Sequence, residues 1–202
     1  MEAPLTYLII AVTVGVSLLA FGNTRLKGSL LFYPVIMRGP EQYYRFFSHG
    51  LIHADYIHLG FNMLTLFFFG RVLESMVFTP LQFILLYVSA LVASSLSDFF
   101  RYRNNRNYAA LGASGAVSAL VFATITLDPW ARGICLYGAL CLPNILFGVL
   151  YVVYCIYMDK RAGDNIAHSA HLWGSIYGLV FTFIVRPDLM INFFNRLIQP
   201  RF

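Results

Sequence analysis

The chain has 202 residues, of which 59% are hydrophobic and only 11% are charged. A soluble domain of this size would have too few charged side chains to cover its surface, so the composition indicates a polytopic membrane protein. The formal net charge of +5 comes from basic residues that are mostly scattered, which suits membrane lipids and gives no support to a nucleic-acid partner.

Six apolar stretches have roughly the length that crosses a bilayer as a helix. In chain order they cover residues 4–22, 56–77, 80–98, 112–127, 133–158 and 165–185. The first stretch is too long for a signal-peptide core and lacks a basic segment before it, so we expect it to stay as a transmembrane helix. The prediction is an all-α, six-helix transmembrane bundle that forms a single domain over residues 1–202.

The long first connection, residues 23–55, is rich in aromatic side chains with arginines between them. Such a mixture suits the bilayer interface, where aromatic rings and the stems of arginines both lie well. We therefore expect a partly embedded loop of short helices.

An even number of spans places both termini on one face of the membrane. In this arrangement five arginines lie on the face of the termini, and nine basic residues lie on the other. Because basic residues are enriched in cytoplasmic loops, this count places the termini outside.

Among the polar residues inside the spans, those that stand out are His58, Asn62, Ser114, His168 and His171. Taken singly, each has a structural explanation, because a serine in a membrane helix usually bonds to its own backbone and a histidine often joins two helices. Together they suit acyl transfer, in which a histidine activates a serine and further donors stabilise the oxyanion.

Glycines flank the serine and follow the second histidine. Gly112 and Gly115 allow backbone and substrate to approach Ser114 closely. Gly174 and Gly178 lie three and seven residues after His171, a spacing that lets two membrane helices touch. The pattern predicts that the fourth and sixth spans pack together and bring His171 to Ser114.

No metal site is expected from the sequence, because HExxH is absent and the close pair His168 and His171 lacks a glutamate partner. The three cysteines show no CxxC spacing and are interpreted as small buried apolar residues. A transporter or channel is disfavoured, because the spans are nearly free of charged residues.

Four segments, in this order, resemble motifs of the rhomboid intramembrane serine proteases. They are YYRFFSH at 43–49, HGLIHADYIHLGFN at 49–62, GASG at 112–115 and AHLWGSIYG at 170–178. The resemblance implies that Ser114 is the nucleophile and His171 its general base. It also implies an oxyanion hole made by His58, Asn62 and the Ser114 N–H, with Gly112 beside them.

The family reaction is hydrolysis of a peptide bond in or near the transmembrane helix of a membrane-protein substrate, without metal or cofactor. The resemblance implies a bacterial inner-membrane protein with cytoplasmic termini, against the arginine count, and we follow the family here. Two positions depart from the pattern: Tyr44 replaces a tryptophan, and Ser118 replaces an aromatic residue that often packs on the catalytic imidazole. The main alternative is an inactive relative that binds transmembrane clients.

Overall fold

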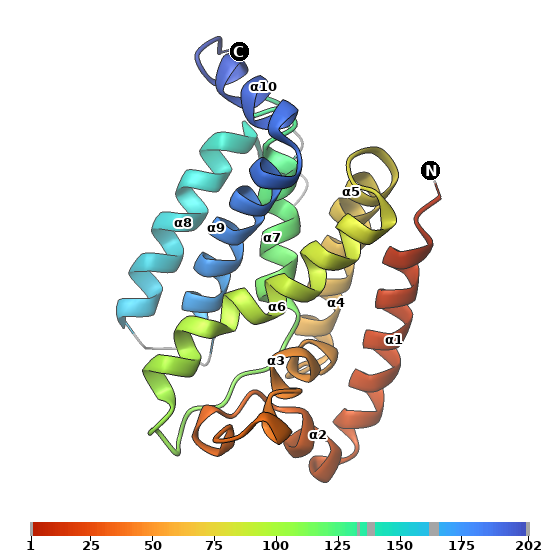
Figure 1. The fold of residues 1–202 in the computed structure, drawn as a ribbon, viewed down its shortest axis with the longest axis vertical. Helices are drawn as coiled ribbons and strands as arrows, with labels where there is room; N and C mark the ends of the chain where they lie inside the picture. Colours follow the sequence, from red (N-terminus) through yellow and green to blue (C-terminus); the bar gives the residue numbers. More distant parts are fainter. Residues whose placement is uncertain (1, 133, 137–139, 162–165, 201–202) are drawn as a thin grey trace.

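The computed structural model describes residues 2–132, 134–136, 140–161 and 166–200, and it is a bundle of helices (Figure 1). Helix α1 (Pro4–Phe21) leads into a connection of short helices: α2 (Thr24–Leu30), η1 (Pro34–Ile36), η2 (Pro40–Gln42), α3 (Arg45–Ser48) and η3 (His49–Leu51). The prediction of short helices in the first connection is confirmed.

Arg45 anchors this connection to itself. Its Nη1 donates to the carbonyl oxygens of Gly28 at 3.1 Å and Leu31 at 2.7 Å, and its Nε donates to Gln42 Oε1 at 2.8 Å. The Arg45 side chain is buried. Its hydrogen bonds join α3 to η2 and to the end of α2.

The second predicted span forms three consecutive segments, namely α4 (Tyr56–Thr65), the π-helical turn η4 (Leu66–Gly70) and α5 (Arg71–Met76). Glu74 in α5 caps the start of α1: its carboxylate accepts from the backbone N–H groups of Leu5 at 2.8 Å and Thr6 at 2.7 Å and from the Thr6 hydroxyl. These amides have no acceptor within their own helix, so the contact satisfies them and joins two distant segments.

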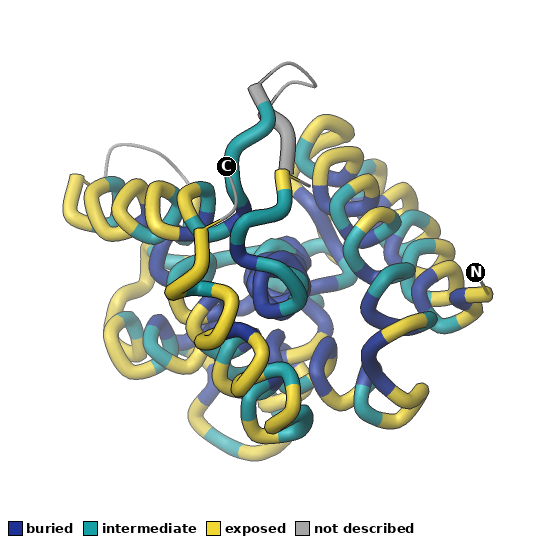
Figure 2. The backbone as a smooth tube through the Cα atoms, turned by 90° about the horizontal axis from the view of Figure 1, so that it is seen from above, coloured by how far each residue is buried: buried dark blue, intermediate teal, exposed yellow. Residues whose placement is uncertain are grey.

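Helix α6 (Pro80–Tyr102) begins with a capping box between Thr79 and Gln82. Helix α7 (Ser114–Ile125) follows and lies at the centre of the bundle, where nearly all of its residues are buried (Figure 2). A helix that is apolar on every side is expected to be enclosed by others, as α7 is here.

The fifth predicted span is wrong at its start. The antiparallel strands β1 (Ile134–Leu136) and β2 (Leu140–Leu142) form a hairpin, and α8 (Asn144–Arg161) begins only after it. The register pairs Cys135 with Cys141 across the two strands, and Cys141 is disulfide-bonded. The interpretation of all three cysteines as buried apolar residues is therefore wrong for Cys141 and holds for Cys155, which is buried and free.

Helix α9 (His168–Val185) matches the sixth predicted span, and a further helix, α10 (Pro187–Leu197), follows after a bend of 114°. Among the described residues, three helical segments are long and apolar enough to cross a bilayer: 4–21, 56–76 and 80–102. The bent pair α9 and α10 passes the same test as one unit.

Helices occupy all six predicted positions, and the protein is an all-α integral membrane protein. Six crossings, however, remain a prediction, because α7 has only 12 residues, or about 18 Å at the rise of an α-helix. That length is shorter than the roughly 30 Å hydrocarbon core. Since its neighbours enclose α7, most of its surface contacts protein rather than lipid.

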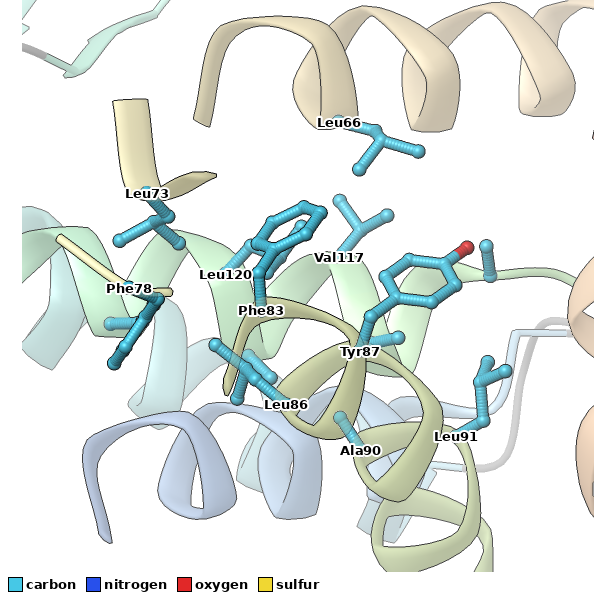
Figure 3. Packing of buried hydrophobic residues seen from close by; sticks show 14 of the residues in the cluster. Leu66, Leu73, Phe78, Phe83, Leu86, Tyr87, Ala90, Leu91, Val117 and Leu120 are labelled. Atoms are coloured by element: carbon cyan, nitrogen blue, oxygen red, sulfur yellow. The ribbon is translucent and has the colours of Figure 1, made fainter. Parts of the chain in front are cut away.

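The main apolar core fills the space between α4, α5, α6 and α7 (Figure 3). Phe83, Leu86 and Tyr87 of α6 belong to the same cluster as Leu66 of η4 and Leu120 of α7. This packing fixes α7, and with it the residue at its first position, Ser114.

Candidate active site

The turn before α7 depends on Gly112, the one glycine among the described residues with a positive φ, at +112°. A Cβ at this position would lie 2.7 Å from His58 Cε1, so a side chain is excluded by both the backbone angle and the space. The turn allows α7 to begin at Ser114, whose side chain then stands at the open N-terminal end of the helix.

Ser114 Oγ lies 2.7 Å from His171 Nε2, a hydrogen-bond distance that joins α7 to α9. The two residues are 57 positions apart in the chain. A serine and an imidazole at this distance have the arrangement in which the ring nitrogen can accept the hydroxyl proton.

Two glycines of α9 make this approach possible. A Cβ on Gly174 would lie 2.1 Å from the carbonyl oxygen of Gly115, and one on Gly178 would lie 2.1 Å from the carbonyl oxygen of Ala119. Any larger residue would push the helices apart, so the predicted packing of the fourth and sixth spans through glycine is confirmed.

His53 holds the turn from the other side. Its Nε2 accepts from the Ala113 N–H at 3.4 Å, which places the ring proton on Nδ1, 3.0 Å from Ser17 Oγ in α1. Burial, with a smaller contribution from His58, lowers the pKa of His53 to about 3, so the ring stays neutral and keeps its acceptor nitrogen.

His49 supports the same turn through its backbone, because its carbonyl oxygen accepts from the Gly112 N–H at 2.9 Å. Burial lowers the pKa of the His49 ring to about 4. The hydrogen bonds of His49 and His53 therefore give both residues a structural role, which is to hold the turn before α7.

His58 and Asn62 lie one turn apart in α4, whose N-cap Asp55 accepts from the His58 N–H at 2.8 Å. Asn62 Nδ2 donates to the His58 carbonyl oxygen at 2.9 Å. Among the described residues, neither side chain bonds to Ser114; the His58 ring lies against Gly112, and Asn62 shares a cavity with Ser114.

That cavity has a volume of about 220 Å³ and is lined by α4, α7 and α8. Asn62, Ser114 and Ser118 supply polar atoms, and the remaining walls are largely apolar, formed by Phe61, Thr65, Val117, Val121, Phe147 and Tyr151. Since Phe61 is 63% exposed on the outer side of α4, the cavity lies close to the lipid-facing surface between α4 and α8.

Tyr151 of α8 was not predicted as a site residue. Its ring lies nearly parallel to that of His171, with 19° between the planes and 6.4 Å between the centroids. Its hydroxyl lies 2.9 Å from Ser118 Oγ. Ser118 occupies the position where the family often has an aromatic residue, so here the ring beside the histidine comes from another helix. The small Ser118 was the only sequence signal.

Asp98 of α6 was also missed. Its carboxylate accepts from the hydroxyl of Ser169 at 2.5 Å and from that of Tyr108 at 2.5 Å. Because Ser169 is the second residue of α9, this bond fixes the end of the helix that carries His171.

His168 and His171 both face α8. The His168 ring is 6.0 Å from that of His171 in an edge-to-face arrangement, and it contacts Tyr154 in the same way at 5.5 Å. Of these two described histidines, His171 is the one that bonds to Ser114.

Comparison with known proteins gives consistent results. Residues 40–188 match the family model described as the Rhomboid domain. The chain is 28% identical over 156 residues to Rhomboid protease GlpG of Haemophilus influenzae, covering 77% of this chain and 76% of that protein.

Two further relatives are matched over a smaller share of their own length. Identity is 31% over 185 residues to Rhomboid protease GlpG of Pectobacterium atrosepticum, covering 89% of this chain and 62% of that protein. Identity is 30% over 168 residues to RHOMBOID-like protein 1 of Arabidopsis thaliana, covering 80% of this chain and 39% of that protein.

Proposed function

Because the chain belongs to the rhomboid family, we propose that it is a serine endopeptidase that cleaves membrane-protein substrates in or near their transmembrane helix. The observation that carries the proposal is the 2.7 Å distance between Ser114 Oγ and His171 Nε2. Two relatives, each named as a rhomboid protease, agree with it.

In the proposed reaction His171 Nε2 accepts the Ser114 proton as the hydroxyl oxygen attacks the scissile carbonyl carbon. The same proton then passes to the leaving amine, and water hydrolyses the acyl-enzyme by the reverse sequence. The dyad has no acidic third member in the proposal, so the orientation of His171 depends on the neutral groups around it.

The oxyanion would be stabilised by the Ser114 N–H and by the side chains of His58 and Asn62. Amides in the first turn of a helix have no acceptor within it and point toward an anion, which favours the start of α7 as such a site. Gly112 contributes by its lack of a side chain, which leaves room for the His58 ring.

Tyr151 is assigned as a positioning residue in this proposal. Its ring lies beside the His171 imidazole, and the bond from its hydroxyl to Ser118 fixes the ring on α7. It would limit rotation of the imidazole away from Ser114.

The substrate is proposed to enter between α4 and α8, where the apolar cavity reaches toward lipid. A helical substrate must expose its scissile carbonyl first, so segments that unwind easily, with small residues, glycine or proline, are expected to be cleaved. We further propose that the protein acts as a single domain over residues 1–202 in a bacterial cytoplasmic membrane, with several crossings and in contact with lipids.

The rival function is an inactive protein that binds transmembrane clients. It is disfavoured, because the chain retains both the serine and the histidine at hydrogen-bond distance. A serine-reactive fluorophosphonate separates the two functions in the detergent-solubilised protein.

We expect labelling of the native chain, no labelling of Ser114→Ala, and unchanged labelling of Ser75→Ala, whose hydroxyl bonds to Arg71 in its own helix. Unlabelled but folded native protein would support the client-binding function instead.

A further inference from the structure

Two side chains that can bind a metal and that the mechanism does not use lie next to His171. Cys155 of α8 and His168 and His171 of α9 each offer one ligand atom, and these atoms all lie within 4.8 Å of one another. Cys155 has no exposed surface and His168 is 3% exposed, so the group lies inside the protein where α8 and α9 pack together.

The ligand types select a class of metal. Zn²⁺ and softer metal ions prefer thiolate and imidazole ligands. Mg²⁺ and Ca²⁺ require oxygen ligands, which these three side chains do not offer. Around a tetrahedral Zn²⁺ the ligand atoms lie about 3.5 Å apart, so closing the group requires side-chain shifts of about 1 Å. Three protein ligands leave a fourth position for water.

We propose that Cys155, His168 and His171 form a site for a thiophilic divalent cation such as Zn²⁺, and that occupancy of this site inhibits the protease. The thiolate would offset part of the charge of the ion in these apolar surroundings. The binding stands on the three ligands alone, whereas the inhibition rests on the proposed role of His171 as general base.

Inhibition follows whichever nitrogen of His171 binds the metal. A bond at Nε2 occupies the lone pair that would accept the Ser114 proton. A bond at Nδ1 leaves the single proton of the neutral ring on Nε2, which again has no free lone pair. The metal and the Ser114 proton therefore compete for the same imidazole.

Binding is tested directly with Cd²⁺, which gives an ultraviolet charge-transfer absorption when it bonds to a thiolate. The detergent-solubilised full chain is titrated without reductant, so that the Cys141 disulfide stays closed. We expect a saturable absorption in the native chain and in Ser114→Ala, its loss in Cys155→Ser, and at least about tenfold weaker affinity in His168→Gln. Val153→Ser, on the exposed side of α8, is the matched control and should bind as the native chain does.

Inhibition is tested by adding Zn²⁺ to a cleavage assay, with each variant compared with its own rate in EDTA. Zn²⁺ should inhibit the native chain and Val153→Ser at similar concentrations, Cys155→Ser should need at least about tenfold more, and Mg²⁺ should have no effect. Absence of the Cd²⁺ absorption, or equal absorption in Cys155→Ser, overturns the metal site and leaves the proteolytic function standing. The native chain could instead show the Cd²⁺ absorption and label with fluorophosphonate, yet keep its cleavage rate in Zn²⁺. That result overturns the inhibition alone.

Discussion

Helices α7 and α9 meet through their backbones, whereas the contacts of α1 with the rest of the protein include hydrogen bonds made by side chains. At the first contact, glycines bring one helix against the carbonyl oxygens of the other. At the second, Glu74 reaches the first amides of α1, and Ser17 of α1 reaches His53.

The difference follows from what each contact must position. A dyad works only when its two atoms stay within hydrogen-bond reach, so its helices need a contact without flexible parts. The contact of α1 supports stability, and for that purpose side-chain hydrogen bonds of ordinary length are sufficient. Variants at the contact of α7 and α9 should therefore lower the cleavage rate, whereas variants at the contact of α1 should lower the stability.

The largest expected effect is on His171. His171→Ala should lower the cleavage rate at least about 1,000-fold, because the serine loses its base. His168→Ala, one turn earlier on the same helix, should keep a substantial fraction of the rate when assayed in EDTA. Equal losses in both variants would mean that the base is misassigned.

The next effect concerns the backbone contact. Gly174→Ala or Gly178→Ala places a carbon 2.1 Å from a carbonyl oxygen, so the helices must separate and cleavage should fall about 100-fold or more. The matched control is Gly60→Ala in α4, where a Cβ meets nothing within 4 Å. The control should keep its rate and gain up to about 1 kcal/mol of stability from the better helix propensity of alanine.

Both rates are measured per folded molecule, with thermal unfolding recorded on the same samples. Native activity in Gly174→Ala would show that the contact can adjust, and the contrast between the two regions would then fail.

An intermediate effect is expected for Tyr151. Tyr151→Ala removes the ring beside His171 and should slow cleavage about 10- to 100-fold, while Tyr151→Phe keeps the ring and should lose only a few-fold. Ser118→Tyr in the Tyr151→Ala background offers a ring from α7 instead and should recover part of the rate. A recovery would show that the ring matters and the helix that supplies it does not; equal rates in Tyr151→Ala and the native chain would exclude the positioning role.

The smallest effect on catalysis is expected at Glu74. Glu74→Gln turns an N–H toward amides that need an acceptor, and it should destabilise the protein by about 1–3 kcal/mol. The rate per folded molecule should stay within about twofold. Glu41→Gln, in the exposed part of the first connection, is the control and should change neither quantity. A lower rate per folded molecule with unchanged stability would show that Glu74 contributes to catalysis, against this prediction.

Much of this contrast was predictable from the sequence, because long apolar runs and glycine spacing are local signals. The stretches without charge indicate where the helices lie, and Gly174 and Gly178 after His171 predict which helix meets Ser114. Helix propensity plays little part in either prediction. The helix positions follow from the cost of burying unpaired backbone polar groups, and the helix contact follows from the lack of space for a Cβ.

The hairpin of β1 and β2 was missed because the hydrophobic pattern of a short apolar run does not distinguish a buried helix from buried strands. Pro143 was the available signal, since proline disfavours helix in the residue before it and is common at the start of one. Tyr151 could not be predicted, because its place beside His171 depends on how α8 rotates against α9, which no spacing in the sequence encodes.

The disulfide of Cys141 links the fold to the chemistry of the compartment on that side of the membrane. The segment leading into the hairpin contacts α10, through Trp130 Nε1 to the Arg196 carbonyl oxygen at 2.9 Å and through Asp128 to Arg196 at 3.3 Å. The hairpin therefore lies at the end of the bundle that carries both termini (Figure 1). Disulfides persist in oxidising compartments and are rare in the cytosol.

The thiol state of Cys141 thus reports the orientation of the protein. With the termini in the cytosol, as the family resemblance implies, glutathione would keep Cys141 as a free thiol. With the termini outside, as the count of basic residues favours, the disulfide would be closed. In intact cells, a membrane-impermeant alkylating reagent should modify Cys141 after treatment with an impermeant reductant only in the second orientation, and in the first it should react only once the cells are permeabilised.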